Sequence, residues 1–146
     1  MTRLNPSEVR QRILDQHDAL RVHLDALQAA LESSTASDVL KKAASQVQEE
    51  LTRHIADEEA LLLPELQGAD GFGAARVAAL QKEHVEQREL LGALVESIKS
   101  SESEGELSAR IHELISRIRV DMEEEEKTHL TKKVLKDDIV LGDPGD

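Results

Sequence analysis

The spacing of the apolar residues constrains the fold of this chain more than any other feature. Four segments repeat an apolar residue every three or four positions, which is the period of an amphipathic helix, and three short polar or glycine-containing breaks separate them. The alternating apolar, β-branched and aromatic runs that strands need are almost absent. The pattern predicts an all-α fold. Four helices of roughly 25 to 30 residues joined by short connections should pack as an antiparallel up-down-up-down four-helix bundle.

The first two expected helices have clear start and stop signals. The first begins after Asn5-Pro6-Ser7-Glu8, a cap with proline in the first turn, and stops in the polar run 33–37. The second extends from residue 38 to about residue 66. The loop 68–73 that follows it holds three glycines, which indicate a turn and a helix C-cap.

The third and fourth expected helices complete a single domain. The polar run 100–103 closes the third helix, and the fourth fades after Leu135. We expect residues 1–136 to form one four-helix bundle and residues 137–146 to form a short acidic C-terminal tail. The length of 146 residues fits one ordinary domain with a buried core.

The composition excludes several classes of partner. The chain has no cysteine, one aromatic residue, Phe72, and a formal net charge of -12. The lack of cysteine excludes disulfide scaffolds, thiolate metal sites and cysteine nucleophiles, and favours a cytoplasmic protein. The negative charge repels phosphate and no aromatic surface is present to stack on bases, so we expect neither nucleic acid nor an anionic membrane as a partner. No apolar run is long enough to span a bilayer, and residues 1–10 lack the apolar core of a signal peptide.

Every expected helix interrupts its apolar stripe with ionisable residues. In the second helix the two interrupting residues are four positions apart, and they therefore share one face. Burying such groups without partners costs several kcal/mol each, so something must compensate them. The interrupting residues are His17 in the first helix, His54 and Glu58 in the second, His84 in the third, and Asp121 and Glu125 in the fourth.

The heights of these six groups along the bundle predict a metal site. Counted from the helix connections at 1.5 Å per residue, the heights differ by about 3 to 6 Å, comparable with one helical turn. Imidazole suits Fe, Zn, Cu and Ni, carboxylates can bridge two ions, and the absence of sulfur argues against copper(I) and iron-sulfur clusters. Iron is the first choice, because bundles that gather His and Glu from facing helices commonly hold a di-iron carboxylate centre.

The same residues, in this order, resemble the hemerythrin-like or HHE cation-binding domain family over about residues 6–133. The most specific match is His-x-x-x-Glu-Glu at 54–59, followed by the family's proline at position 64. Gln16-His17 and Glu83-His84 look like the histidine motifs of the first and third helices. Residues 121–126 align with a second His-x-x-x-Glu-Glu motif, so the two halves of the chain form a weak internal duplication.

The resemblance implies a non-heme di-iron centre, with Glu58 and a fourth-helix carboxylate bridging the two ions. It also implies that the centre binds or responds to oxygen, nitric oxide, peroxide or iron itself. We expect two irons per chain, with one iron or one zinc as the open alternative. The expected partners are these metal ions and a small diatomic or peroxide ligand, while no protein partner can be named.

Two positions depart from the family pattern. Many members have a further third-helix histidine one turn before His84, where this chain has Leu80, and the fourth-helix histidine is replaced by Asp121. A ligand set poorer in histidine and richer in carboxylate should favour the ferric state and disfavour reversible oxygen binding.

The fourth helix leaves its ligand assignment open. Only one or two residues of the acidic run 123–126 can point inward, and the stripe spacing favours Glu125 over Glu126. His129 lies one turn further on and could replace the missing histidine ligand. Otherwise we expect it, like His23 and His112, to lie at the surface or rim.

A second hypothesis is a metal-depleted bundle that acts as a regulatory or protein-interaction module. It is kept because an i,i+4 pair of His and Glu and an acidic run are also ordinary features of a helix surface. A hydrolytic enzyme finds no support, since the chain has neither a Gly-x-Ser-x-Gly elbow nor a glycine-rich phosphate loop. Only slow peroxide or oxygen chemistry at the metal is left open as an activity.

Overall fold

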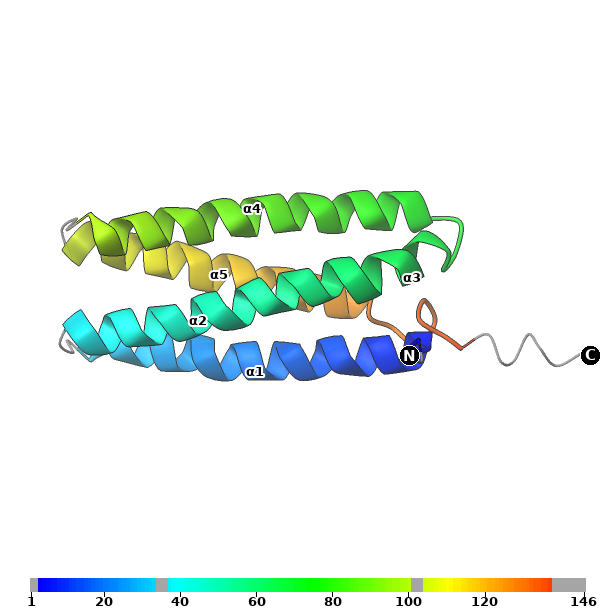
Figure 1. Ribbon diagram of the computed structural model, residues 1–146, viewed down its shortest axis with the longest axis horizontal. Coiled ribbons are helices and arrows are strands. Elements are labelled where there is room, and N and C mark those ends of the chain that lie inside the picture. Colours follow the sequence, from blue (N-terminus) through cyan, green and yellow to red (C-terminus); the bar gives the residue numbers. More distant parts are fainter. Residues whose placement is uncertain (1–2, 34–36, 101–103, 138–146) are drawn as a thin grey trace, which may run out of the picture.

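The computed structural model describes residues 3–33, 37–100 and 104–137, and these form a bundle of four long antiparallel helical arms (Figure 1). The second arm is a continuous run of three elements, because a π-helical turn, η1, separates α2 from α3. The predicted all-α four-helix bundle is confirmed. The elements are α1 (Pro6–Glu32), α2 (Ser37–Asp57), η1 (Glu58–Leu62), α3 (Leu63–Gln67), α4 (Gly73–Lys99) and α5 (Glu104–Thr128).

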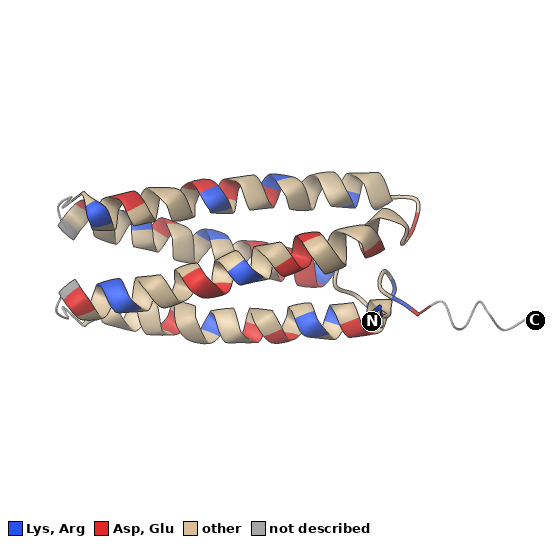
Figure 2. Cartoon of the chain, viewed as in Figure 1, with Lys and Arg blue, Asp and Glu red and all other residues tan. Residues whose placement is uncertain are grey.

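The arms pack as a closed ring of neighbours. α1 contacts α2 and α5, while α4 contacts α3 and α5. Acidic and basic residues are distributed along all four arms (Figure 2). None of the helices in the described part of the chain is both long enough and apolar enough to span a membrane.

The start of α1 is fixed by the signal that the sequence predicts. The Asn5 side chain accepts a hydrogen bond from the backbone N–H of Glu8, and the Glu8 carboxylate accepts one from the N–H of Asn5, both at 3.0 Å. Pro6 occupies the first helical turn, where its missing N–H removes no intrahelical bond. This reciprocal capping box satisfies two backbone donors at the helix end.

The second arm contains a π-helical turn that the sequence analysis did not predict. The N–H of Leu63 bonds to the carbonyl of Glu58, five residues earlier, and Pro64 follows immediately. Proline has no N–H, and its ring clashes with the carbonyl four residues before it, so a widened turn just ahead of Pro64 relieves the strain. The turn begins at Glu58, one of the predicted metal ligands.

The loop between α3 and α4 is tight. Gly68 caps the C-terminus of α3, as expected for a glycine of this loop. A Cβ atom at Gly73 would lie 2.2 Å from the carbonyl oxygen of Gln67, so the first residue of α4 must be glycine for α3 and α4 to approach this closely.

The fourth helix ends earlier than predicted. α5 stops at Thr128 rather than near Leu135, and the chain then turns back over the end of the bundle. Leu130 and Leu135 are buried there, and the carbonyl of Leu130 accepts a hydrogen bond of 2.8 Å from Nε of Arg10. The burial of these apolar side chains against α1 outweighs the helical pattern of the segment.

The predicted acidic tail lies outside the described residues except for Asp137. Its carboxylate accepts hydrogen bonds from the N–H and the hydroxyl of Ser7, at 2.9 and 2.8 Å, which holds Asp137 against the first turn of α1. The boundary between bundle and tail therefore stays a prediction.

Two hydrophobic cores fill the bundle, and a polar layer of buried histidines and carboxylates separates them. The large core lies toward the ends of α1 and α4, and the small core surrounds the turn that follows α5. Residues of the large core are Leu20, Leu24, Leu27, Ala44, Val47, Leu51, Ile55, Leu91, Leu94, Ile111, Leu114, Ile115, Ile118 and Met122. Residues of the small core are Val9, Ile13, Leu62, Leu66, Leu80, Leu130, Val134 and Leu135.

Candidate metal centre

The polar layer between the two cores consists of histidines and carboxylates from all four arms. His17, His54, Glu58, His84 and Glu125 are each no more than 3% exposed. Charged or polar groups buried this deeply are stable only when they are paired with one another or with an ion. The layer is therefore either a self-compensating hydrogen-bond network or a metal centre.

Four of these side chains converge on one point. His17, His54, Glu58 and Glu125 each offer a ligand atom, and these four atoms all lie within 4.8 Å of one another. Around a single ion with bonds of about 2.0 to 2.2 Å, opposite donors stand roughly 4 Å apart. Small side-chain shifts would close this set around a cation.

His84 contributes a fifth donor at the edge of the group. Its Nε2 lies 2.9 Å from Oε1 of Glu58, and Nε2 of His54 lies 3.3 Å from the same oxygen. On the other side of the layer, Nε2 of His17 lies 3.2 Å from Oε1 of Glu125. All three imidazoles therefore turn the same nitrogen inward, toward a carboxylate.

The outer nitrogens of two histidines are held by carboxylates that are themselves paired with arginine. Nδ1 of His17 lies 2.7 Å from Glu126, which accepts from Arg21 at 2.8 Å. Nδ1 of His84 lies 3.0 Å from Glu59. Glu59 in turn accepts two hydrogen bonds from Arg88, at 2.8 and 2.9 Å.

A glutamine orients the third histidine. Nδ1 of His54 lies 2.9 Å from Oε1 of Gln16, whose amide nitrogen donates to Asp57 at 2.6 Å. Because the amide oxygen can only accept, Nδ1 of His54 carries the proton. The same tautomer suits the other two imidazoles, whose Nδ1 atoms face carboxylates. In its neutral form, a ring of this tautomer would present the Nε2 lone pair to a bound metal ion, as metal-binding histidines with an outer partner do.

The electrostatics of the layer fit a cation. Burial raises the pKa of Glu58, but the charge of His54 and hydrogen bonds from His54 and His84 outweigh it, so the pKa lies well below the usual value. Burial and the charge of Glu58 raise the pKa of Glu125 well above its usual value. One carboxylate can thus ionise only at the expense of the other, and Oε2 of Glu58 has no hydrogen-bond partner among the described residues. A positive ion between them would stabilise both ionised forms.

The imidazoles respond to the same environment in opposite directions. Burial and the neighbouring His54 lower the pKa of His17. Burial also opposes protonation of His84, but hydrogen bonds and charges from Glu58 and Glu59 outweigh it and raise the pKa of that ring. His17 is therefore more readily held neutral than His84, and the neutral form is the one that binds metal.

Asp121 is the predicted site residue that does not join the converging group. Its Oδ2 accepts a hydrogen bond of 3.0 Å from the amide of Gln87, and its Oδ1 lies 3.9 Å from Arg117. Burial raises the pKa of Asp121, while the Gln87 hydrogen bond and the Arg117 charge oppose the rise. The side chain is one carbon shorter than glutamate and is directed to a neighbour rather than to the centre.

The sequence left three candidate ligands open at the fourth helix, and the structure places them differently. Glu125 points into the layer, whereas Glu126 points to the outer nitrogen of His17. His129 is buried, which corrects the expectation of a surface or rim position, because the turn after Thr128 folds it inward. His23 is half-buried and His112 is exposed.

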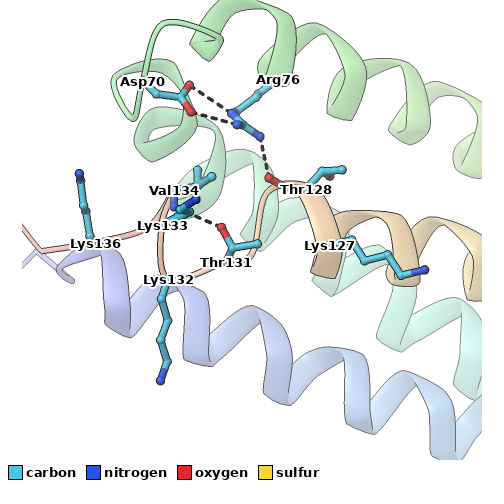
Figure 3. Close-up of a pocket in the computed structure, with 9 residues that line it drawn as sticks. All are labelled: Asp70, Arg76, Lys127, Thr128, Thr131, Lys132, Lys133, Val134 and Lys136. Carbon is cyan, nitrogen blue, oxygen red and sulfur yellow. Dashed lines mark hydrogen bonds and ion pairs between the residues drawn. The ribbon is translucent and has the colours of Figure 1, made fainter.

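Arg76 closes the end of the bundle beside His129. Its guanidinium donates to Asp70 at 2.9 and 3.2 Å and to the carbonyl of Thr128 at 2.6 Å, as Figure 3 shows. It also lies 3.3 Å from Nδ1 of His129. Burial and the charge of Arg76 lower the pKa of His129. A cation already faces this ring, so His129 is poorly placed as a metal ligand.

A surface hollow of about 680 Å³ lies over this end of the bundle. It is lined by lysines of the segment after α5, and their ammonium groups extend in different directions (Figure 3). Ammonium groups repel metal ions and here do not converge on one point. The hollow is therefore not the metal centre.

Glu83 is the residue of the layer that sequence reasoning missed as a site candidate. It is half-buried on α4, its Oε1 is buried with no hydrogen-bond partner among the described residues, and it interacts with Glu125. Burial raises the pKa of Glu83 to about 7. The apolar stripe was traced through Leu80, His84 and Gln87, and it therefore excluded Glu83, the residue directly before His84. Glu83 nevertheless lies three residues after Leu80 and so near the same helix face.

Comparison with known protein families gave a match that covers most of the chain. The family model of the hemerythrin HHE cation-binding domain matches residues 9–132. Neither the curated proteins nor the solved structures gave a significant match. The matched range includes every residue of the polar layer.

Proposed function

We propose, from the premise that this chain belongs to the hemerythrin HHE cation-binding domain family, that its polar layer holds non-heme iron in a carboxylate-rich centre, with two irons per chain. Cation binding follows from the family and from the converging histidines and glutamates. Iron, its stoichiometry and a cytoplasmic location are our proposal. The observation that carries it is the inward orientation of Nε2 in all three buried imidazoles.

Five side chains would hold the metal. His17, His54 and His84 would each donate through Nε2, and Glu58 and Glu125 have the two oxygens needed to bridge a pair of ions. Bound iron would supply a change of oxidation state and open coordination positions for oxygen, nitric oxide or peroxide. The five donors lie together in one buried layer, which supports a centre of more than one ion.

The chain itself supplies orientation and exclusion of water. Glu126 with Arg21, and Glu59 with Arg88, fix the outer nitrogens of His17 and His84, so the rings keep one tautomer and one direction. The large and small cores cover the layer on both sides. A site enclosed in this way selects small ligands over large ones.

The donor set favours sensing or response over reversible carriage of oxygen. Carboxylates stabilise ferric iron more than histidines do, and the layer has lost one histidine relative to the repeated motif, at Asp121. We propose that the centre senses or binds a small oxidant, nitric oxide or iron itself, and that peroxide or oxygen chemistry at the metal is slow.

Anaerobic titration of metal-free protein with ferrous iron tests this function. Wild type should bind two irons, and the affinity of His54→Ala and of Glu58→Ala should fall by more than the roughly 10- to 100-fold typical of losing an outer partner. His112→Ala removes an exposed imidazole and is the matched control, which should bind as wild type does. If wild type takes up no iron, the metal-depleted interaction module becomes the better description.

A further inference from the structure

The two halves of the chain repeat the same polar contacts with a constant step. His17 and His84, Glu58 and Glu125, and Arg21 and Arg88 are each 67 positions apart. Nε2 of each of these histidines faces the inner glutamate of the other half, at 3.2 and 2.9 Å. The outer contacts with glutamate and arginine repeat in the same way. The centre is thus built with approximate twofold symmetry.

The symmetry fails around His54 and its partner Gln16. Stepping 67 positions from His54 leads to Asp121, and stepping 67 from Gln16, which orients His54, leads to Glu83. The first half therefore has a histidine held by an amide where the second half has two carboxylic acids. The nitrogen donor that His54 supplies has no counterpart in the second half.

Asp121 does not fill the missing position. Gln87 donates to one of its oxygens at 3.0 Å, and Arg117 stands 3.9 Å from the other. Gln87 has no counterpart in the first half, where Leu20 occupies the equivalent position. The second half therefore uses a polar side chain of its own to hold Asp121 in place.

Glu83 has a buried oxygen with no hydrogen-bond partner among the described residues, and Asp121 has no such buried atom. Among the described residues, three buried side-chain oxygens have no hydrogen-bond partner, and they belong to Glu58, Glu83 and Gln87. Glu58 is completely buried in the centre, and Glu83 interacts there with Glu125. A buried acceptor without a partner carries a desolvation penalty, which a metal ion would remove.

We propose that Glu83 is a metal ligand that replaces the missing fourth-helix histidine, so that the centre has two unequal positions. One position draws on His17 and His54, and the other draws on His84 and Glu83, with Glu58 and Glu125 between them. This inference rests on the proposed function. The Glu83 position has more oxygen donors and should bind the second metal ion with its own, separate affinity.

Metal titration of Glu83→Gln tests the assignment. The substitution keeps the shape and removes the charge, and Glu89→Gln makes the same change at an exposed site of α4 as the matched control. Metal-free wild type, both variants and Asp121→Asn would be titrated anaerobically with ferrous iron. Cobalt(II), whose visible absorption reports ligand type, would be used in parallel.

Wild type, Glu89→Gln and Asp121→Asn should each bind two ions in two steps. Glu83→Gln should keep the first step unchanged and weaken the second at least tenfold, with a changed cobalt spectrum for that ion alone. Adding Asp121→His to Glu83→Gln should restore the second step, because it supplies at position 121 the imidazole that His54 supplies in the first half. Circular dichroism of the metal-free variants checks that the fold is kept.

Three results would overturn the assignment while leaving iron binding intact. In the first, Glu83→Gln binds the second ion as wild type does. In the second, Asp121→Asn alone no longer binds the second ion, which would make Asp121 the ligand. A wild type that binds one ion only would also reject the two unequal positions. A wild type that binds no ion would instead reject the proposed function itself.

Discussion

His17 and His54 meet edge to face in the middle of the bundle, with ring centroids 5.0 Å apart and ring planes inclined at 62°. Two imidazoles this close cannot both be protonated without repulsion, and the pKa of His17 is lowered by burial first and by His54 second. Both rings anchor Nδ1 outward on different partners, Glu126 and Gln16. The pair thus turns both Nε2 atoms inward, where we propose that they bind one ion.

The outer carboxylates should tune metal affinity without being ligands. Glu126→Ala and Glu59→Ala each release Nδ1 of one histidine, so the ring loses its fixed orientation. We expect each to weaken iron affinity roughly 10- to 100-fold with the stoichiometry unchanged. Competition with a chelator measures this. Glu123→Ala, exposed on the same helix as Glu126, should have no effect, and an equal loss there would mean that net charge alone sets the affinity.

The large core should contribute stability independently of the metal. Leu27 is fully buried in this core and lies several turns from the polar layer. Leu27→Ala should lower the free energy of unfolding by about 2 to 5 kcal/mol, through lost burial and the cavity left behind. Urea unfolding of the metal-free protein gives this value, and elemental analysis should find wild-type iron content in the folded variant. A folded variant that has lost its iron would contradict the independence of the large core and the metal centre.

The loop before α4 should tolerate alanine at one glycine and not at another. At Gly73 a Cβ atom would meet backbone atoms of Gln67 at 2.2 and 2.8 Å, which only a shift of the chain can relieve. We expect Gly73→Ala to destabilise the protein by about 1 to 3 kcal/mol. A Cβ atom at Gly71 would meet nothing within 4 Å, so Gly71→Ala should be neutral or slightly stabilising. Equal melting temperatures for the two variants would count against the close approach of α4 to the end of α3.

The ion pair between Asp70 and Arg76 should give a defined pH dependence. Hydrogen bonds from Arg76 lower the pKa of Asp70 below its usual value of 3.8, so the folded state binds this proton more weakly than the unfolded state. The stabilisation is then present above pH 3.8 and is lost as the pH falls through the lower pKa of the folded state. The effect is small because the carboxylate is exposed.

Thermal unfolding of Asp70→Asn measures that contribution. The variant should melt slightly below wild type between about pH 5 and 8, and the two curves should converge in the acidic range below pH 3.8. A difference that stays constant down to the lowest pH would contradict a contribution from the ionised Asp70 carboxylate.

Much of the fold follows from periodicity, because each helix buries one stripe. The capping box at Asn5 and the burial of Leu20 or Leu91 could be predicted, since local sequence and helical spacing decide them. The end of α5 could not. The helical pattern continues to Leu135, and only packing against the end of the bundle shows that the chain turns at Thr128.

The candidate site could be predicted by the same reasoning wherever the ligands lie on the stripe. His17, His54, Glu58, His84 and Glu125 all interrupt it, and the structure brings them into one layer. Asp121 also interrupts the stripe but is too short and is bound by Gln87, which spacing does not reveal. Glu83 lies one position off the stripe and enters the layer by the reach of its side chain.

Elemental analysis of protein purified without chelators tests the proposed iron centre most directly. Mass spectrometry would measure Fe, Zn, Mn, Ni and Cu per chain in wild type and in Glu58→Ala. We expect about two irons per chain in wild type and a strong loss of iron in the variant. No metal in wild type, even after reconstitution with ferrous iron, or equal iron in both proteins, would contradict the proposed iron centre.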